Sequence, residues 1–211
     1  MTYVAVDVDG TLTHSNMSFS FGRYLYKQNV ISLFDSFRLA LIYAAHAWGF
    51  LSMERLHASV FQFLFAGKKS ELIERLADQF FEQQEEGFFR GGVKQEISQL
   101  LKKGERVALL SSSPDFLVQR VARHIGVEEW YATEYVVEKG IFTRLGKIVT
   151  GSEKAKIASH IRSIEGFSIM VFTDSALDLP LAQMADHVVA VCPDRKLLQI
   201  SREKGWRVVN G

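Results

Sequence analysis

The sequence has one cysteine and almost no net charge, and both features exclude classes of protein. The single cysteine, Cys192, rules out an internal disulfide and any metal site made of several cysteines. It therefore favours a reducing, cytoplasmic location. With 25 Lys and Arg against 24 Asp and Glu, the formal net charge is +1. No overall positive field attracts nucleic acid, so we expect no nucleic-acid partner.

Long hydrophobic runs are also missing. The longest apolar stretch, residues 39–51, is shorter than the roughly 20 residues that span a bilayer, although it is long enough for a buried or membrane-surface helix. The first residues lack a basic segment, and Asp7 and Asp9 interrupt the apolar run, so we expect no signal peptide. A chain of 211 residues fits one domain with an insert.

Strand-like and helix-like patterns alternate along most of the chain. Short β-rich runs predict strands at 3–6, 106–110, 167–172 and 187–191, an edge strand at 207–209, and a strand or hairpin over 131–143 with a turn at Lys139-Gly140. Helices are predicted at 93–103, at 114–125 with Pro114 first, at 152–164 with Ser152 as its cap, at 179–184 and from Asp194 onward. This order predicts an α/β fold with a parallel sheet and helices on both faces.

One long stretch departs from the alternation. Residues 18–88 have helical periodicity and no proline, and the pattern breaks near Asn29, Ser52 and Gly67, which predicts four helices. Eleven of the sixteen phenylalanines lie between residues 16 and 88. We interpret 16–88 as an inserted helical domain, and 1–15 with 89–211 as the core.

Polar residues follow three of the predicted strands. Asp7 and Asp9 end the first strand, a run of three serines follows the strand at 106–110, and Asp174 and Asp178 follow the strand at 167–172. If these strands are parallel neighbours, all three clusters meet at one edge of the sheet. Carboxylates brought together repel one another, and a hard cation bound by oxygen ligands, such as Mg²⁺, relieves the repulsion.

These clusters resemble the motifs of the haloacid dehalogenase-like (HAD) hydrolases. Residues 7–12 read Asp-Val-Asp-Gly-Thr-Leu and match the D-x-D-G-T-L motif. Ser111, Lys154 and the pair Asp174 and Asp178 stand, in order, where that superfamily places its other three motifs. The Ser-Ser-Ser-Pro and Asp-Ser-x-x-Asp-Leu-Pro runs look like its phosphoserine-phosphatase-like branch, subfamily IB. The resemblance covers essentially the whole chain and implies a Rossmann-like core with a helical C1-type cap.

The resemblance implies a Mg²⁺-dependent phosphatase acting through an aspartyl-phosphate. Asp7 would be the nucleophile and Asp9 the general acid and base. The second aspartate points to phosphate-ester chemistry, because dehalogenases and P-type ATPases lack it. The metal would be held by the Asp7 carboxylate, the Asp9 backbone carbonyl and Asp174.

The remaining motif residues receive binding or supporting roles from the same resemblance. Ser111 and Ser112 would bind phosphate oxygens, together with neighbouring backbone N–H groups. Lys154 would pair with the nucleophile and the phosphoryl oxygens, with Lys147 as the alternative lysine. Thr11 and Asp178 would support the site, and Asp178 would orient Lys154 or a metal-bound water. 

The predicted cap bears on the substrate, which the resemblance implies is a phosphorylated small molecule or a lipid phosphate. Phosphoserine phosphatases carry a glutamate shortly after the first motif, whereas Asn16 stands at about that position here, which argues against phosphoserine. The aromatic residues of the cap are either a bundle core or a lipid-facing surface. The second interpretation is similar to phosphatidylglycerophosphate phosphatases of this superfamily and implies peripheral membrane contact at 39–51, between Arg38 and Arg55.

Other functions fit parts of the same pattern. A phosphotransferase or mutase would use the same aspartyl-phosphate. A non-enzymatic phosphoacceptor, such as a response-regulator receiver, also gathers Asp, Ser or Thr and Lys at strand ends, but such domains have only about 120 residues and no helical insert. A catalytically inactive member of the superfamily acting as a binding module would not need every motif residue. The sequence gives neither the natural substrate nor the oligomeric state.

Overall fold

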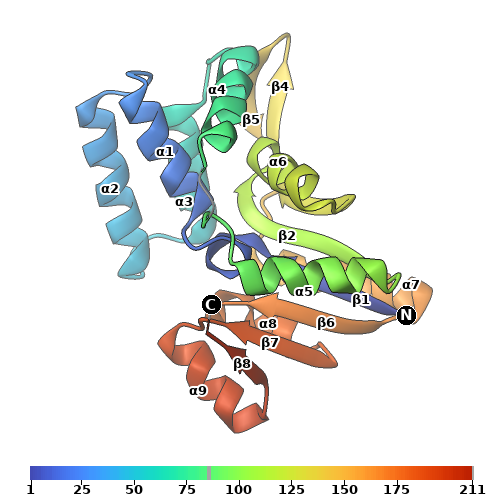
Figure 1. The fold of residues 1–211 in the computed structure, drawn as a ribbon. Helices are drawn as coiled ribbons and strands as arrows, with labels where there is room; N and C mark the ends of the chain where they lie inside the picture. The colour runs from blue at the N-terminus through green and yellow to red at the C-terminus, as the bar shows by residue number, and fades with distance from the viewer. Residues whose placement is uncertain (85–86, 211) are drawn as a thin grey trace.

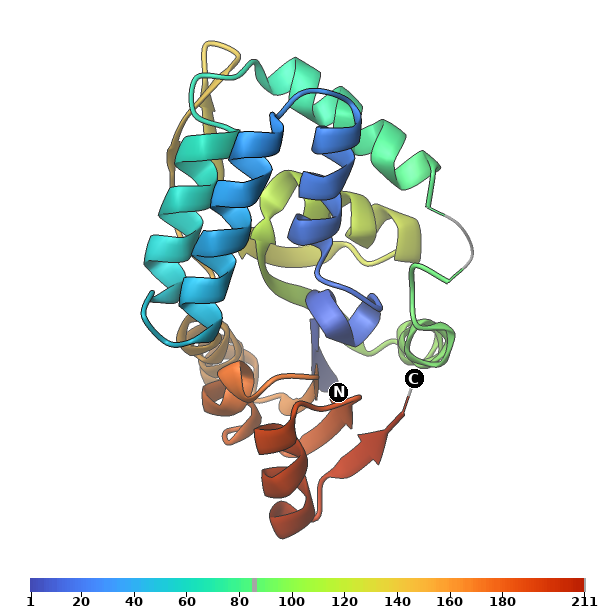
Figure 2. The same ribbon diagram turned by 90° about the vertical axis from the view of Figure 1, so that its left-hand side faces the viewer.

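The computed structural model describes residues 1–84 and 87–210 (Figure 1). Residues 85 and 86 of the predicted cap and residue 211 of the predicted core lie outside the described residues. The described chain forms a sheet with flanking helices and a group of helices that lies apart from the sheet in Figures 1 and 2.

A six-stranded parallel sheet in the order β3-β2-β1-β6-β7-β8 forms the centre of the first part and confirms the predicted α/β class. In this order β1 lies between β2 and β6, and Val6 is level with Leu109 on one side and Phe172 on the other. The strands are β1 Thr2–Asp7, β2 Arg106–Pro114, β3 Glu129–Thr133, β6 Ser168–Thr173, β7 His187–Val191 and β8 Arg207–Val209.

Helices cover both faces of the sheet, as the sequence predicts. Alternate residues of β1 point to opposite faces, so Val4 and Val6 belong to one buried cluster while Tyr3 and Ala5 belong to another. The first cluster includes residues of α5 (Gly91–Lys102) and α6 (Asp115–Ile125), and the second includes residues of α7 (Gly151–Glu165) and α8 (Leu179–Ala182). A last helix, α9 (Arg195–Lys204), packs beside β7 and β8.

Several boundaries differ from the sequence-based prediction. The strand expected at 106–110 continues to Pro114, because Pro114 still pairs with Thr133 of β3. Pro114 is therefore the residue before α6 and not its first residue. Likewise Thr150, and not Ser152, precedes α7. The expected loop after β1 contains a short helical turn, Val8–Leu12.

The region predicted as one strand or hairpin at 131–143 contributes to two separate sheets. Its first part is β3 in the main sheet, and the rest is the hairpin β4 (Tyr135–Glu138) and β5 (Ile141–Leu145). The turn at Lys139 and Gly140 is confirmed, and both residues have positive φ, as a tight hairpin turn requires. The hairpin bonds to the helical region through Phe142, whose N–H donates to the Lys68 carbonyl at 3.0 Å.

Four helices at the predicted breaks form what we call the helical lobe: α1 Met17–Lys27, α2 Leu33–Ala47, α3 Met53–Leu64 and α4 Ser70–Glu82. Figure 2 shows α1, α2 and α3 side by side. Side chains fix where these helices begin. The Phe19 N–H donates to the Asn16 side chain at 2.9 Å, and Ser32 and Asp35 form a reciprocal capping box.

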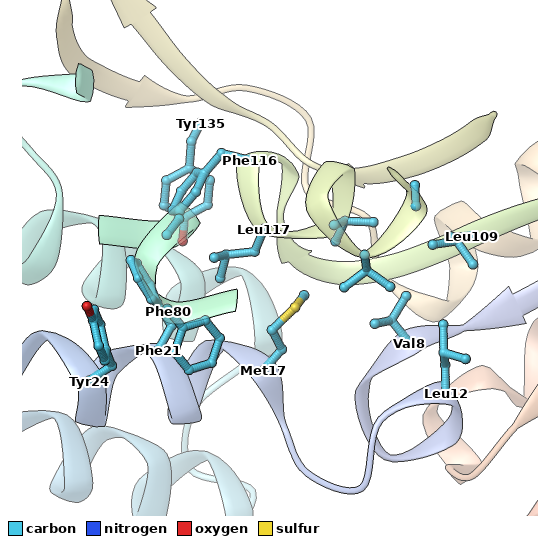
Figure 3. Packing of buried hydrophobic residues seen from close by; sticks show 14 of the residues in the cluster. Val8, Leu12, Met17, Phe21, Tyr24, Phe80, Leu109, Phe116, Leu117 and Tyr135 are labelled. Carbon is cyan, nitrogen blue, oxygen red and sulfur yellow. The ribbon is translucent and has the colours of Figure 1, made fainter. Parts of the chain in front are cut away.

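Apolar packing joins the lobe to the sheet without a break (Figure 3). Val8 and Leu12 at the end of β1 lead through Met17 to Phe21 of α1. Phe21 then contacts Phe80 of α4 and Phe116 of α6, with ring centroids 5.5 Å and 6.0 Å apart and edge-to-face geometry. Such aromatic pairs each add about 1 kcal/mol beyond the area they bury, so they hold the lobe over the carboxyl end of the sheet.

The large apolar residues of the lobe divide into a buried set and an exposed set. Phe21, Phe61, Phe65 and Phe80 are buried in the core. A second set, which we call the outer apolar face, is exposed by half or more and comprises Leu33, Phe34, Phe37, Leu41, Trp48 and Phe50. Within residues 1–84 and 87–210, no helix combines the length and the apolar character needed to cross a membrane.

Candidate active site

Asp7 lies at the carboxyl end of β1, where only 7% of the residue is exposed. Its Oδ1 accepts a hydrogen bond from Lys154 Nζ at 2.5 Å, and its Oδ2 accepts one from Thr11 Oγ1 at 3.2 Å. Burial raises the pKa of the Asp7 carboxyl well above its usual range. Lys154 opposes this rise, and Asp178 and Asp174 add to it.

Lys154 reaches this edge from the first turn of α7. Its Nζ also donates to Asp178 Oδ2 at 2.8 Å, so one buried ammonium joins two carboxylates. Burial alone would lower the pKa of Lys154, but Asp178 and Asp7 hold that pKa above its ordinary value. The alternative lysine, Lys147, lies outside this group: its side chain is 61% exposed and pairs with Glu153.

Asp178 is further held by a residue that the sequence analysis did not single out. Thr173, the last residue of β6, donates from Oγ1 to Asp178 Oδ2 at 3.1 Å. Thr173 directly precedes Asp174 in the sequence. This position indicates that Thr173 lies at the sheet edge where the other polar residues gather, because the parallel strands all end there.

Asp9 points away from Asp7 and Asp174 toward the end of β2. Its Oδ1 accepts from the Met17 N–H at 2.6 Å, and its Oδ2 accepts from the hydroxyls of Ser111 at 3.0 Å and Ser113 at 2.7 Å. Ser112 is half-buried and borders the cavity described below. Strand alternation explains why Ser111 and Ser113 act together, and the sequence analysis missed Ser113 because it ended the strand at residue 110.

Thr11 links Asp7 to Asp174. Its Oγ1 lies 3.2 Å from Asp7 Oδ2 and 3.0 Å from Asp174 Oδ1, and its single proton cannot serve both carboxylates at once. Burial raises the pKa of Asp174 as well. Gly10 makes this approach possible, because a Cβ at that position would lie 2.2 Å from Asp174 Oδ2, and its φ is +84°.

These residues fit a hard divalent cation. Two crowded carboxylates, Asp7 and Asp174, share one hydroxyl donor, and carboxylate oxygens are the ligands that such a cation prefers. Among the described residues, no three His, Cys, Asp or Glu side chains are grouped to hold a metal. The Asp9 side chain is engaged elsewhere, so a cation here would use two carboxylates and a backbone carbonyl, with its other ligands from substrate or water.

A cavity of about 680 Å³ opens between the sheet edge and the helical lobe. Its floor contains Asp7, Asp9, Lys154 and Asp174. Its opposite side, which we call the lobe wall, comprises Tyr43, His46, Met53, Glu54, Leu56, His57, Val60 and Tyr135. These residues could not be identified as a wall from the sequence. Helical periodicity is the same for a residue that faces a cavity and for one that faces a core.

Known proteins resemble this chain over nearly its whole length. The solved structure of a Bordetella pertussis protein of unknown function matches with a TM-score of 0.89 at 18% identity, covering 99% of this chain and 98% of the other. A substrate-bound phosphoserine phosphatase structure matches with a TM-score of 0.70 at 19% identity, covering 99% and 92%. At these identities the structures show a shared fold.

The sequence comparisons agree with the fold. A phosphoserine phosphatase of Mycobacterium tuberculosis is 25% identical over 213 aligned positions, which cover 96% of this chain and 68% of the relative. The model of the haloacid dehalogenase-like hydrolases matches residues 4–183. That match runs from the first strand past Asp178, and so includes every residue gathered around Asp7. The chain therefore belongs to the haloacid dehalogenase-like hydrolase family.

Proposed function

We propose that this protein is a Mg²⁺-dependent phosphatase that hydrolyses phosphomonoesters through an aspartyl-phosphate on Asp7. The observation that carries this proposal is the arrangement of the floor of the cavity. Asp7 is fixed by a buried lysine, and Asp9 is two residues away and fixed by separate donors. Two carboxylates with different partners suit two different roles, one as nucleophile and one as acid and base.

In the first half of the reaction, an Asp7 carboxylate oxygen attacks phosphorus and the ester P–O bond breaks. The leaving oxygen takes a proton from the Asp9 carboxyl group, which becomes a carboxylate. Hydrogen bonds from the Ser113 hydroxyl and the Met17 N–H would hold Asp9 in place for this transfer, while the Ser111 hydroxyl turns from Asp9 to the phosphoryl group. Preorganised donors of this kind avoid reorganisation during the step.

In the second half, Asp9 accepts a proton from water as the water oxygen attacks the phosphorus of the aspartyl-phosphate. The bond between phosphorus and Asp7 breaks, inorganic phosphate leaves and the Asp7 carboxylate is restored. Asp9 is then protonated again for the next cycle. The protons and charges balance over the two halves.

The remaining residues of the floor bind the phosphoryl group and the metal. Ser111, Ser112 and Lys154 would bind phosphoryl oxygens, while Asp178 keeps Lys154 in position. Asp7, Asp174 and the Asp9 carbonyl would hold Mg²⁺, which neutralises charge on the phosphoryl group when bound. We assign residues 16–88 as the cap over this site and residues 1–15 with 89–211 as the catalytic core.

Phosphate release from a panel of phosphomonoesters in the presence of Mg²⁺ tests this function. The panel contains p-nitrophenyl phosphate, phosphoserine, sugar phosphates, nucleotides, lysophosphatidate and phosphatidylglycerophosphate, with the D7N variant as the blank. We expect release that stops on chelation with EDTA and returns with Mg²⁺. Absence of release from every ester, or release that is indifferent to EDTA, would overturn the proposal.

A lipid phosphate met at a membrane surface is the second candidate substrate, and the outer apolar face favours it. Phe34, Phe37 and Leu41 lie on one side of α2 and are 66%, 60% and 55% exposed. Burying such side chains in a bilayer surface is favourable by about 1.5–3 kcal/mol each.

Co-sedimentation with anionic vesicles tests this candidate. The triple variant F34S/F37S/L41S should lose binding, whereas I164S, which changes an exposed apolar residue of α7, should keep it.

A further inference from the structure

The lobe wall provides uncharged hydrogen-bonding groups and almost no positive charge. Within the described residues, Lys154 is the only lysine or arginine that borders the cavity. Its ammonium already pairs with Asp7 and Asp178 on the floor. A leaving group that carries a carboxylate or a second phosphate would therefore meet no lysine or arginine on the lobe wall.

The lobe wall also carries an acidic side chain. Glu54 lies in the first turn of α3, and bonds from its own N–H and from the Ser52 hydroxyl lower the pKa of its carboxyl group. Its carboxylate thus occupies the helix N-terminus, the feature of the wall that would otherwise attract an anion. A negative leaving group would be repelled at this rim.

His57 adds no charge to the lobe wall at neutral pH. His57 is only 9% exposed, and its Nε2 is buried without a hydrogen-bond partner among the described residues. Burial, with the nearby His46, lowers the pKa of His57 to about 4, so its imidazole is neutral at neutral pH. Leaving such an atom unpaired is unfavourable by about 1–3 kcal/mol.

Two tyrosines complete the wall. The hydroxyls of Tyr43 and Tyr135 make no hydrogen bond within the described part of the chain, and both residues border the cavity. Burial raises the pKa of Tyr43 to about 12, and burial and Tyr43 raise the pKa of Tyr135, so both hydroxyls stay protonated. They can donate to or accept from hydroxyl groups of a ligand.

We propose that the cavity selects phosphomonoesters with an uncharged, hydroxyl-bearing leaving group, and that Tyr43 determines this specificity by hydrogen bonding to one of its hydroxyls. The inference rests on the proposed phosphatase function and adds the class of substrate. It disfavours phosphoserine, whose leaving group carries a carboxylate.

A matched pair of substrates tests the charge of the leaving group. Glycerol 3-phosphate and 3-phosphoglycerate differ in having a hydroxymethyl group or a carboxylate at the same place. We expect kcat/KM to be roughly tenfold or more higher for glycerol 3-phosphate, because the carboxylate would be desolvated without a partner. Equal values, or a preference for 3-phosphoglycerate, would overturn the inference.

Placing a cation on the lobe wall should change this preference. Met53 is half-buried on the wall, and M53R should narrow the ratio of kcat/KM values by raising turnover of 3-phosphoglycerate, whereas M53Q, which adds no charge, should keep the ratio near that of the natural protein. An M53R ratio no different from that of M53Q would count against the charge argument.

The role of Tyr43 is tested with substrates that do or do not carry hydroxyls. In Y43F the ring is retained and its hydroxyl is lost. We expect kcat/KM to fall about fivefold more for glycerol 3-phosphate than for p-nitrophenyl phosphate, in line with the loss of one hydrogen bond. An equal fall for both substrates would show a merely structural role for Tyr43 and overturn the assignment.

These outcomes separate the inference from the proposed function. If p-nitrophenyl phosphate is hydrolysed and the two glycerol-based esters are hydrolysed equally, the function stands and the inference fails. If no ester is hydrolysed, the function fails. Calorimetric binding of glycerol 3-phosphate and 3-phosphoglycerate to the D7N variant then still tests the cavity, with tighter binding of the first expected and equal binding contrary to the inference.

Discussion

The floor of the cavity and the lobe wall differ in how their polar groups are partnered. On the floor, Asp7, Asp9 and Asp178 each accept at least two hydrogen bonds from buried or half-buried donors. On the lobe wall, the Nε2 atom of His57 has no partner among the described residues. The difference teaches that the floor is preorganised around its own carboxylates, whereas the lobe wall leaves a buried polar atom unpaired.

The largest expected effect comes from removing the nucleophile on the floor. D7N should lower kcat on the order of 10⁴-fold, because an amide cannot form the acyl-phosphate. The measurement is phosphate release, with a circular dichroism spectrum to show that the fold is intact. The matched control D35N changes a half-buried aspartate of the α2 capping box, away from the cavity, and should stay within twofold. Substantial turnover by D7N would contradict the role of Asp7.

The buried lysine of the floor should matter both for stability and for turnover. K154M leaves the Asp7 and Asp178 carboxylates without their shared cation, so we expect a loss of roughly 3–5 kcal/mol in the free energy of unfolding. K147M, which changes an exposed lysine nearby, should shift it by no more than about 0.5 kcal/mol. Urea denaturation measures both variants. Equal losses of unfolding free energy in K154M and K147M would mean that the buried ion pairs of Lys154 do not contribute to stability.

The lobe wall predicts a pH dependence of stability. In the unfolded chain His57 binds a proton near pH 6.5, whereas burial lowers its pKa to about 4 in the folded protein. The unfolded state thus binds more protons between these values, so the free energy of unfolding falls as the pH falls from 6.5 to 4. The contribution of His57 to this fall is about 3 kcal/mol.

Urea midpoints at pH 7 and pH 4 test this dependence. H57Q should lose less stability than the natural protein over that interval, because glutamine does not titrate. The exposed His160 provides the matched control, and H160Q should follow the natural protein. Parallel curves for the natural protein and H57Q would show that His57 is not kept neutral by burial.

The smallest expected effect comes from comparing substitutions at two glycines, which separates the cost of a close contact from the cost of backbone strain. Gly10 and Gly67 both have positive φ, at +84° and +76°, but a Cβ meets Asp174 only at Gly10. G10A should therefore destabilise the protein by about 2 kcal/mol more than G67A and raise the Mg²⁺ concentration needed for half-maximal activity. If the two variants behave alike in both measurements, the packing of Gly10 against Asp174 is unimportant.

The same comparison shows what the sequence could predict. The meeting of Asp7, Ser111 and Asp174 follows from local patterns, because parallel strands end at one edge of a sheet wherever their connections lead. The four helices of the lobe were also predictable, since residues such as Ser32 and Ser52 mark their starts. These features depend on short stretches of sequence and not on distant contacts.

The lobe wall depends on contacts between distant segments and was not predictable. Tyr135 reaches the wall because the hairpin after β3 forms hydrogen bonds with the loop after α3. No local sequence pattern predicts this contact. Phe21 and His57 both lie at apolar-face positions of their helices, yet one packs in the core and the other borders the cavity. Only the packing of the lobe on the sheet distinguishes these two outcomes.

The most direct test of the account is to find where the phosphoryl group is held during turnover. The protein is mixed with p-nitrophenyl phosphate and Mg²⁺, quenched during the first turnovers and treated with borohydride, which reduces an acyl-phosphate to an alcohol. Peptide mass spectrometry then locates the reduced residue. The account predicts conversion of Asp7 to homoserine, and none without substrate. Reduction at Asp9 or Asp174, or phosphate release with no reducible intermediate, would contradict it.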